Sequence, residues 1–148
     1  MAFRYRLQAV LRLRSSLERQ EEQRLTQAAG VVARLRAEIE ELEERRFEEK
    51  RRAFQELAAG SAGAIFQFLA AGDMAYAEKK RALGLELEKA EKRRLELLER
   101  YKKVRQDREI LERLRERQEE AYNLEFARRE QQTADEAFLN RSLKHSNE

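Results

Sequence analysis

The side chains that could do chemistry in this chain are arranged in a way that argues against catalysis. His145 is the only histidine and lies in a polar tail, KHSNE. There is no cysteine, which excludes a cysteine metal site and a disulfide. Carboxylates occur in runs such as EIEELEE, with basic residues three or four positions away, which is typical of surface ion pairs on a helix. GSAG lacks the spacing and the lysine of a phosphate loop. We therefore expect no enzymatic activity, no cofactor and no metal site.

The most distinctive charged group is a cluster of arginines near the start of the chain. The net charge of +3 is small beside 32 basic and 29 acidic residues, so the basic excess is local. A local basic end favours an acidic protein surface, anionic lipid or nucleic acid. Phe3 and Tyr5 interleave the arginines, as in segments that bind nucleic acid, but apolar residues here also fit a helical seam. We expect a protein partner, and neither nucleic acid nor insertion into a membrane. The arginines that precede the first acid, Glu18, are Arg4, Arg6, Arg12 and Arg14.

The elements that must position these residues are two long helices. Charged residues make up 41% of the chain and proline is absent, so nothing forces a helix to end. Apolar residues recur at alternating steps of three and four, which predicts a coiled-coil seam. In the first arm the predicted seam shifts phase twice, first between Leu17 and Leu25, where Glu21 lies near the expected seam position, and again before Phe47. The seam residues of this arm are Phe3, Leu7, Val10, Leu17, Leu25, Ala28, Val32, Leu35, Ile39, Leu42, Phe47, Phe54 and Leu57. In the second arm it comprises Leu83, Leu87, Ala90, Arg94, Leu97, Tyr101, Val104, Arg108, Leu111, Arg115, Gln118 and Tyr122.

An uncharged stretch, LAAGSAGAIFQFLAAG at residues 57–72, separates the two arms. Its glycines predict a turn around Gly60–Gly63 and a second break near Gly72, with Asp73 capping the next helix. The expected fold is all-α, a long two-helix antiparallel coiled-coil hairpin that is monomeric. The alternative, a parallel dimer of one continuous helix, is disfavoured by the glycines. The expected single domain, residues 1–148, divides into a first helix (1–58), an uncharged tip (59–73), a second helix (74–127), and a continuing helix with a flexible tail (128–148).

The tip holds several large apolar side chains that two narrow helices can cover only in part. Exposed apolar groups mark partner sites, although these residues could also fold back as a cap. The candidates for contact with a partner are Phe66, Phe68, Leu69 and Tyr76.

Both ends of the chain resemble the flagellar export protein FliJ family. The opening resembles the family's pattern of two aromatic residues, Leu and Val-Leu, followed by Arg and Glu on a long helix. The residues that carry it are Phe3, Tyr5, Leu7, Val10, Leu11, Arg14, Glu18, Leu25 and Ala28. The closing segment is similar at Glu130, Asp135, Glu136, Ala137 and Arg141. No motif at the tip aligns with the family.

The resemblance implies an antiparallel coiled coil similar to the central stalk of rotary ATPases. Such a protein sits in the hexameric ring of the flagellar type III export ATPase, promotes its assembly and activity, contacts the membrane export-gate protein, and escorts export chaperones. It would be cytoplasmic and peripherally associated with the inner face of the cell membrane at the export apparatus. The end with both termini, which holds the four arginines, would enter the ring, and the tip would face the gate or chaperones. The alternatives are the equivalent stalk protein of a virulence injectisome and a generic coiled-coil scaffold without an ATPase partner.

Overall fold

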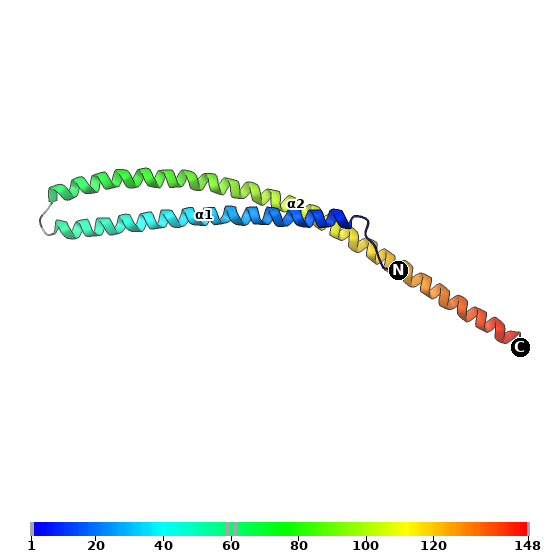
Figure 1. The fold of residues 1–148 in the computed structure, drawn as a ribbon. Helices are drawn as coiled ribbons and strands as arrows, with labels where there is room; N and C mark the ends of the chain where they lie inside the picture. Colours follow the sequence, from blue (N-terminus) through cyan, green and yellow to red (C-terminus); the bar gives the residue numbers. More distant parts are fainter. Residues whose placement is uncertain (1, 59, 61, 148) are drawn as a thin grey trace. The chain divides into compact units, whose positions relative to one another are not determined.

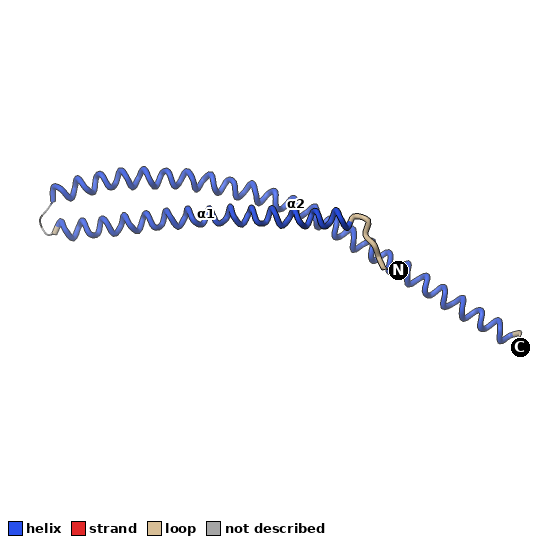
Figure 2. The backbone as a smooth tube through the Cα atoms, viewed as in Figure 1, coloured by secondary structure: helices blue, strands red, loops and turns tan. Residues whose placement is uncertain are grey.

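The computed structural model describes residues 2–58, 60 and 62–147, and its regular structure is helical. Helix α1 spans Gln8–Leu57 and helix α2 spans Ala62–Ser146 (Figure 1). The described residues contain no strand, and loop is confined to the segment before α1, the turn and the last residues (Figure 2). The prediction of an all-α chain with two long helices that pack together is confirmed.

The chain divides into two compact units. The terminal unit comprises residues 1–18 and 103–148, and the turn unit comprises residues 19–102. In the turn unit the helices are antiparallel, since Arg36 pairs with Glu91 whereas Arg46 pairs with Asp73. In the terminal unit, the start of α1 likewise packs against the middle of α2. The prediction that residues 1–148 act as one domain stays a prediction.

Helix α1 keeps an unbroken heptad seam. The steps from Leu11 to Arg46 alternate between three and four, and the side chains at these positions are buried or half-buried. The sequence predicted two shifts in phase, one near Glu21 and one before Phe47. The shifts do not occur, since most of the charged seam residues find a partner across the helix pair. The seam positions are Leu11, Arg14, Glu18, Glu21, Leu25, Ala28, Val32, Leu35, Ile39, Leu42 and Arg46.

Two aromatic residues that were predicted to extend this seam lie outside it. Phe47 is 68% exposed and Phe54 is 62% exposed, whereas Arg46 and Ala53 are each 5% exposed. The next step of the seam after Leu42 is four residues long and ends at Arg46, so the adjacent Phe47 lies outside the seam. The prediction for Phe47 and Phe54 was wrong, because it followed the apolar residue instead of the helical phase.

The seam also starts differently from the prediction. Helix α1 begins only at Gln8, so Leu7 and Val10 do not share a helical face with Phe3 and are 38% and 39% exposed. Tyr5, in the non-helical segment, is 8% exposed and occupies the inner position instead.

The turn between the helices depends on one glycine. Gly60 has φ 109°, in the left-handed region that favours glycine, and its N–H donates to the Leu57 carbonyl at 3.1 Å. The turn overlaps the predicted range at Gly60, whereas Gly63 lies in α2; residues 59 and 61 are outside the described ones. The second break, near Gly72–Asp73, was wrong, because α2 continues through both residues and Asp73 caps no helix. In the segment where the sequence predicted a continuing helix and a flexible tail, α2 extends to Ser146; Glu148 lies outside the described residues.

Candidate functional site

The segment before α1 is held on α2 by aromatic residues. The Tyr5 hydroxyl donates to the Leu111 carbonyl at 3.1 Å. The ring of Phe3 lies 5.7 Å from that of Tyr122, which stacks on Phe126 at 6.4 Å. Alternate residues therefore point to α2 and to solvent. Arg4 and Arg6, which alternate with these aromatic residues, are on the solvent side.

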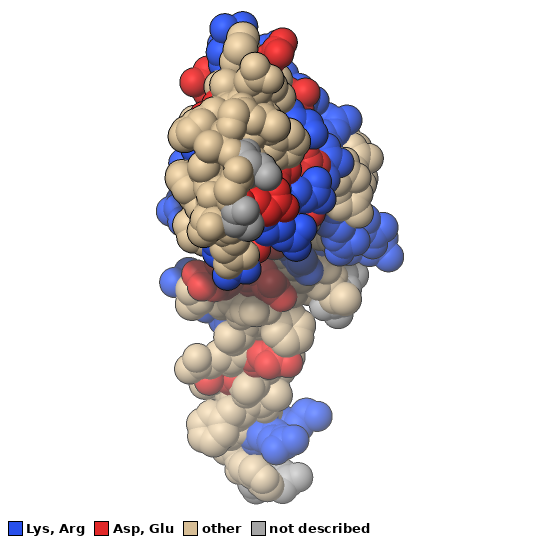
Figure 3. Space-filling model, turned by 90° about the vertical axis from the view of Figure 1, so that its left-hand side faces the viewer, with Lys and Arg blue, Asp and Glu red and all other residues tan. Residues whose placement is uncertain are grey.

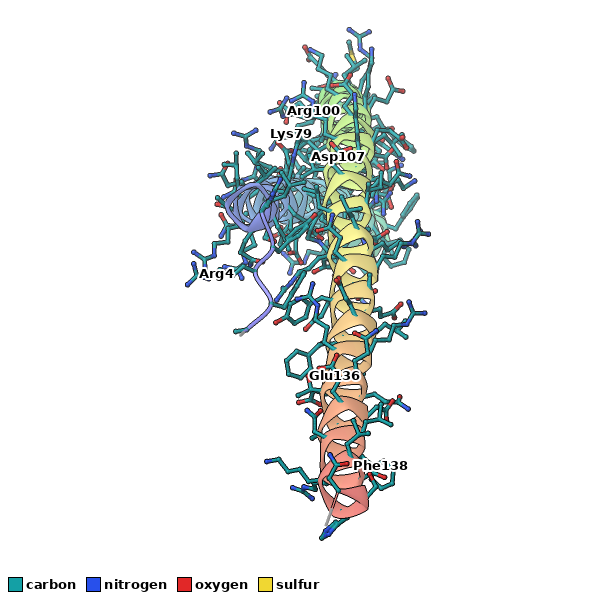
Figure 4. The ribbon with its side chains drawn as sticks, turned by 90° about the vertical axis from the view of Figure 1, so that its right-hand side faces the viewer. Arg4, Lys79, Arg100, Asp107, Glu136 and Phe138 are labelled. Carbon is teal, nitrogen blue, oxygen red and sulfur yellow. The ribbon has the colours of Figure 1, made fainter. Side chains whose placement is uncertain are left out.

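Three of the four predicted arginines are free to meet a partner. Arg4, Arg6 and Arg12 are exposed, and none has an ion pair recorded among the described residues. Figure 4 shows Arg4 extending away from α2. These side chains keep their charge in water, where an acidic surface could bind them.

The fourth arginine, Arg14, lies in the seam between α1 and α2. Arg14 is half-buried, and its Nη1 lies 3.4 Å from Oδ2 of Asp107 on α2. Both side chains are about 40% exposed, so solvent screens this ion pair and it contributes little to stability. The cluster predicted from the sequence therefore divides into three surface cations and one seam cation.

A second charged group in the terminal unit is more deeply buried. Nε of Arg108 pairs with Glu18, and Nη1 pairs with Glu112 one turn along α2. The side chains of Glu18 and Arg108 are only 15% and 19% exposed. The hydrogen bond with Glu18 raises the pKa of Arg108 above its ordinary value, against the opposing effect of burial. Arg108 was predicted as a polar seam residue, but its partner was not.

The last part of α2 has no helix beside it. Every described residue from Asn123 to Asn147 is exposed, including Asp135 and Glu136 of the closing pattern. Phe138 is 71% exposed and stands clear of the rest of the terminal unit (Figure 4). A hollow on this part of α2 is lined by Tyr122, Phe126, Ala134 and Ala137 among others. Such a surface is open to a partner.

At the tip, the four predicted residues separate into two pairs. Phe66 and Phe68 are 60% and 61% exposed, whereas Leu69 and Tyr76 are half-buried on the inner face of α2. The Tyr76 ring lies 5.6 Å from Nζ of Lys80. Seen end-on in Figure 3, the tip presents mostly uncharged side chains. The exposed pair is the accessible part of the predicted surface.

Arg46 of α1, near the tip, contacts α2 through its guanidinium group, and this contact was not predicted from the sequence. We call the contacts of Arg46 with α2 the clasp. Nη2 of Arg46 donates to the Leu69 carbonyl at 2.8 Å and to Oδ1 of Asp73 at 2.7 Å. A Cβ added at Gly72 would lie 2.4 Å from Nη1 of Arg46. Gly72 therefore makes room for a guanidinium group instead of breaking the helix. The signal in the sequence was the heptad phase, which places Arg46 in the seam.

The clasp makes stability depend on pH in acid. Hydrogen bonds from Arg46 and then Lys50 lower the pKa of Asp73 below its ordinary value of 3.8. A group whose pKa falls on folding stabilises the protein above its unfolded-state pKa and loses that effect as the pH falls through the folded-state value. We expect wild type to exceed Asp73→Asn in stability by a constant margin near neutral pH, and this margin to shrink below about pH 4. Urea unfolding at a series of pH values measures it. A margin independent of pH would contradict the assignment.

Among the described residues, no group of three His, Cys, Asp or Glu side chains could hold a metal ion. Within the same part of the chain, neither helix has a stretch apolar enough to cross a membrane.

A comparison with protein-family models matches residues 3–147 to the flagellar FliJ protein. The chain belongs to the FliJ family. Searches of curated proteins and of solved structures returned no match. Membership of the FliJ family makes the chain a non-catalytic component of flagellar protein export.

The residues that resemble the opening pattern of the FliJ family have structural roles here. Tyr5 and Leu11 are buried, and Arg14 and Glu18 form ion pairs with α2. These residues hold the start of the chain on α2 in the terminal unit, where Arg4, Arg6 and Arg12 are exposed.

Proposed function

We propose that the protein is the central stalk of the flagellar type III export ATPase. Its terminal unit enters the ATPase ring, where Arg4, Arg6 and Arg12 meet acidic groups and promote ring assembly and hydrolysis. The single observation that supports this site is the exposure of these three arginines in the terminal unit. Arg14, which was part of the predicted contact, contributes by holding α1 on α2.

The mechanism is allosteric. In the terminal unit two antiparallel helices pack without rotational symmetry about their axis, and such an asymmetric insert makes the subunits of a symmetric ring inequivalent. Each subunit then meets a different set of charges, so binding energy differs around the ring. At the tip, Phe66 and Phe68 contact the export-gate protein or an export chaperone, with Leu69 and Tyr76 supporting them from the inner face. This role places the protein in the cytoplasm, at the inner face of the cell membrane.

Titrating the purified chain into the export ATPase tests the proposal. Wild type should raise both hydrolysis and ring formation. The triple variant Arg4→Glu, Arg6→Glu, Arg12→Glu should need about tenfold more protein for half-maximal stimulation, because like charges would then face each other. The matched control reverses three exposed arginines of the turn unit, Arg81, Arg93 and Arg100, and should leave the stimulation unchanged.

Three outcomes count against this function. No stimulation by a several-fold excess of wild type would indicate a coiled-coil scaffold without an ATPase partner. Equal losses in the triple variant and its control would show a general effect of charge. Stimulation of an injectisome ATPase in preference to the flagellar one would assign the chain to the other export system.

A further inference from the structure

The outward face of α1 near the turn carries a second heptad pattern. Glu40, Glu44, Phe47, Arg51 and Phe54 follow steps of four, three, four and three, and all are exposed. We call these five residues the outer stripe. None of them belongs to the seam with α2. Alternating steps of three and four keep residues on one face of a helix, and a second helix can pack against residues with this spacing.

Two shallow hollows lie along the outer stripe, beside its phenylalanines. One hollow is lined by Phe47 with Glu40, Glu43, Glu44 and Glu48, and the next by Phe47 and Phe54 with Arg51 among others. The two phenylalanines leave more than half of their surface in water, at 68% and 62% exposure. Burying aromatic side chains of this size would provide most of the affinity of a small interface.

The charges along the stripe argue against a second copy of the chain. Parallel pairing in register would set Glu40, Glu44 and Arg51 against their own counterparts, which places like charges opposite each other. In antiparallel pairing the two alternate heptad positions face each other. Since Phe47 and Phe54 occupy the same position, each would face a charge such as Glu44 or Arg51. A parallel pair shifted by one heptad would set Phe47 against Phe54 and Glu44 against Arg51, but Glu40 would then face Phe47, and the two copies would not be related by a two-fold axis.

We propose that the outer stripe binds an amphipathic helix of another protein. The partner helix carries basic residues opposite Glu40 and Glu44, apolar residues opposite Phe47 and Phe54, and an acid opposite Arg51. Arg51 pairs with Glu48 of its own helix at 3.0 Å, and the acid of the partner would share or replace this exposed contact. Among the described residues, no ion pair is recorded for Glu40 or Glu44, so both acids are available. The same acids would repel an anionic membrane surface. This inference does not rest on the proposed role in the ATPase ring.

A designed helical peptide of about three heptads tests the surface. The peptide is designed to pair in parallel with α1. Its residues opposite the five stripe positions are, in order, Lys, Lys, Leu, Glu and Leu, with the spacing of the outer stripe. In a control peptide, lysine and glutamate are exchanged. Fluorescence anisotropy with the full chain should give a dissociation constant of about 1–100 µM for the first peptide and at least tenfold weaker binding for the control. The variant Glu40→Lys, Glu44→Lys should reverse this preference.

Substitution of the phenylalanines provides the second arm. Phe47→Ala, Phe54→Ala should weaken binding of the designed peptide by at least about tenfold. Both side chains are exposed, so the fold should survive, and an unfolding curve checks this. The matched control, Phe66→Ala, Phe68→Ala, removes two phenylalanines of similar exposure away from the stripe and should leave binding unchanged.

Cross-linking in cells identifies the occupant. A photoreactive phenylalanine at position 54 should capture a helical segment of another protein with the charge order described above. Capture of a second copy, dimerisation that Phe47→Ala, Phe54→Ala abolishes, or binding to phosphatidylglycerol vesicles lost in the same variant would each overturn the proposal. Equal affinity for the two designed peptides would overturn it as well.

Discussion

Replacing Gly72 with alanine will destabilise the protein, although an alanine is the better residue for a helix interior. At an exposed position within a helix, replacing Gly with Ala raises the free energy of unfolding by about 1 kcal/mol. Here the new Cβ would lie 2.4 Å from Nη1 of Arg46, so the guanidinium must leave its place on α2. Arg46 would then lose its hydrogen bond to the Leu69 carbonyl, a bond from a charged donor worth about 1.5–3 kcal/mol. We expect a net loss of roughly 0.5–2 kcal/mol in the free energy of unfolding.

The sign of this effect should depend on Arg46. In an Arg46→Ala background there is no guanidinium to displace, so Gly72→Ala should stabilise by about 1 kcal/mol. Gly84 provides the matched control, because it lies in α2 and an added Cβ meets nothing within 4 Å. Gly84→Ala should stabilise wild type and Arg46→Ala by the same amount. Urea unfolding of the four Gly72 and Arg46 combinations gives the coupling energy.

Stabilisation by Gly72→Ala in wild type would show that Arg46 finds equivalent partners elsewhere. The clasp would then be a surface contact without influence on the register of the helices in the turn unit.

Much of the fold follows from the seam pattern and the absence of proline. The apolar positions from Leu25 to Leu42 and from Leu83 to Tyr101 were assigned correctly, because apolar burial and helical period agree there. The turn was also found, since Gly60 must adopt a conformation that other residues avoid. In these segments the local backbone preference of the residues and their packing in the folded protein favour the same structure.

The errors occur where a charged residue occupies the seam. Phe47 was assigned to the seam instead of Arg46, and Glu21 was interpreted as part of a shift in phase. A charge in a seam is unfavourable unless a partner on the facing helix offsets the cost of its burial. That partner lies far along the sequence, as Asp73 does for Arg46 and Arg108 for Glu18. Periodicity alone does not reveal such pairs.

The candidate site was predicted in part for the same reason. The arginine cluster was visible as a composition bias, but only the packing of Tyr5 and the pairing of Arg14 separate surface cations from a seam cation. At the tip, the sequence indicated an apolar group without showing which side chains face solvent. The outer stripe was missed, because Phe47 and Phe54 were assigned to the seam.

Reversing the charge of Glu18 will loosen the packing of the terminal unit. Glu18→Lys would leave Arg108 without its main partner and set two cations together at a site where the wild-type side chains are 15% and 19% exposed. Removing one member of a buried pair is strongly destabilising, and partial exposure reduces the cost here to roughly 2–3 kcal/mol. Urea unfolding should show this loss, and amide hydrogen exchange should speed up in residues 8–18 and 103–115.

The reciprocal substitution should rescue most of that loss. In Glu18→Lys, Arg108→Glu the charges are exchanged and the pair is restored, but the new acid lies beside Glu112, which now repels it. Recovery should therefore be substantial and incomplete, and adding Glu112→Gln should improve it. Glu125→Lys is the control, since its pair with Arg129 is 64% and 74% exposed and should change stability by less than about 0.5 kcal/mol. If the double reversal is no more stable than either single variant, the contact between Glu18 and Arg108 does not hold α1 on α2, and the arginines that the terminal unit presents are positioned by the aromatic contacts of Phe3 and Tyr5 alone.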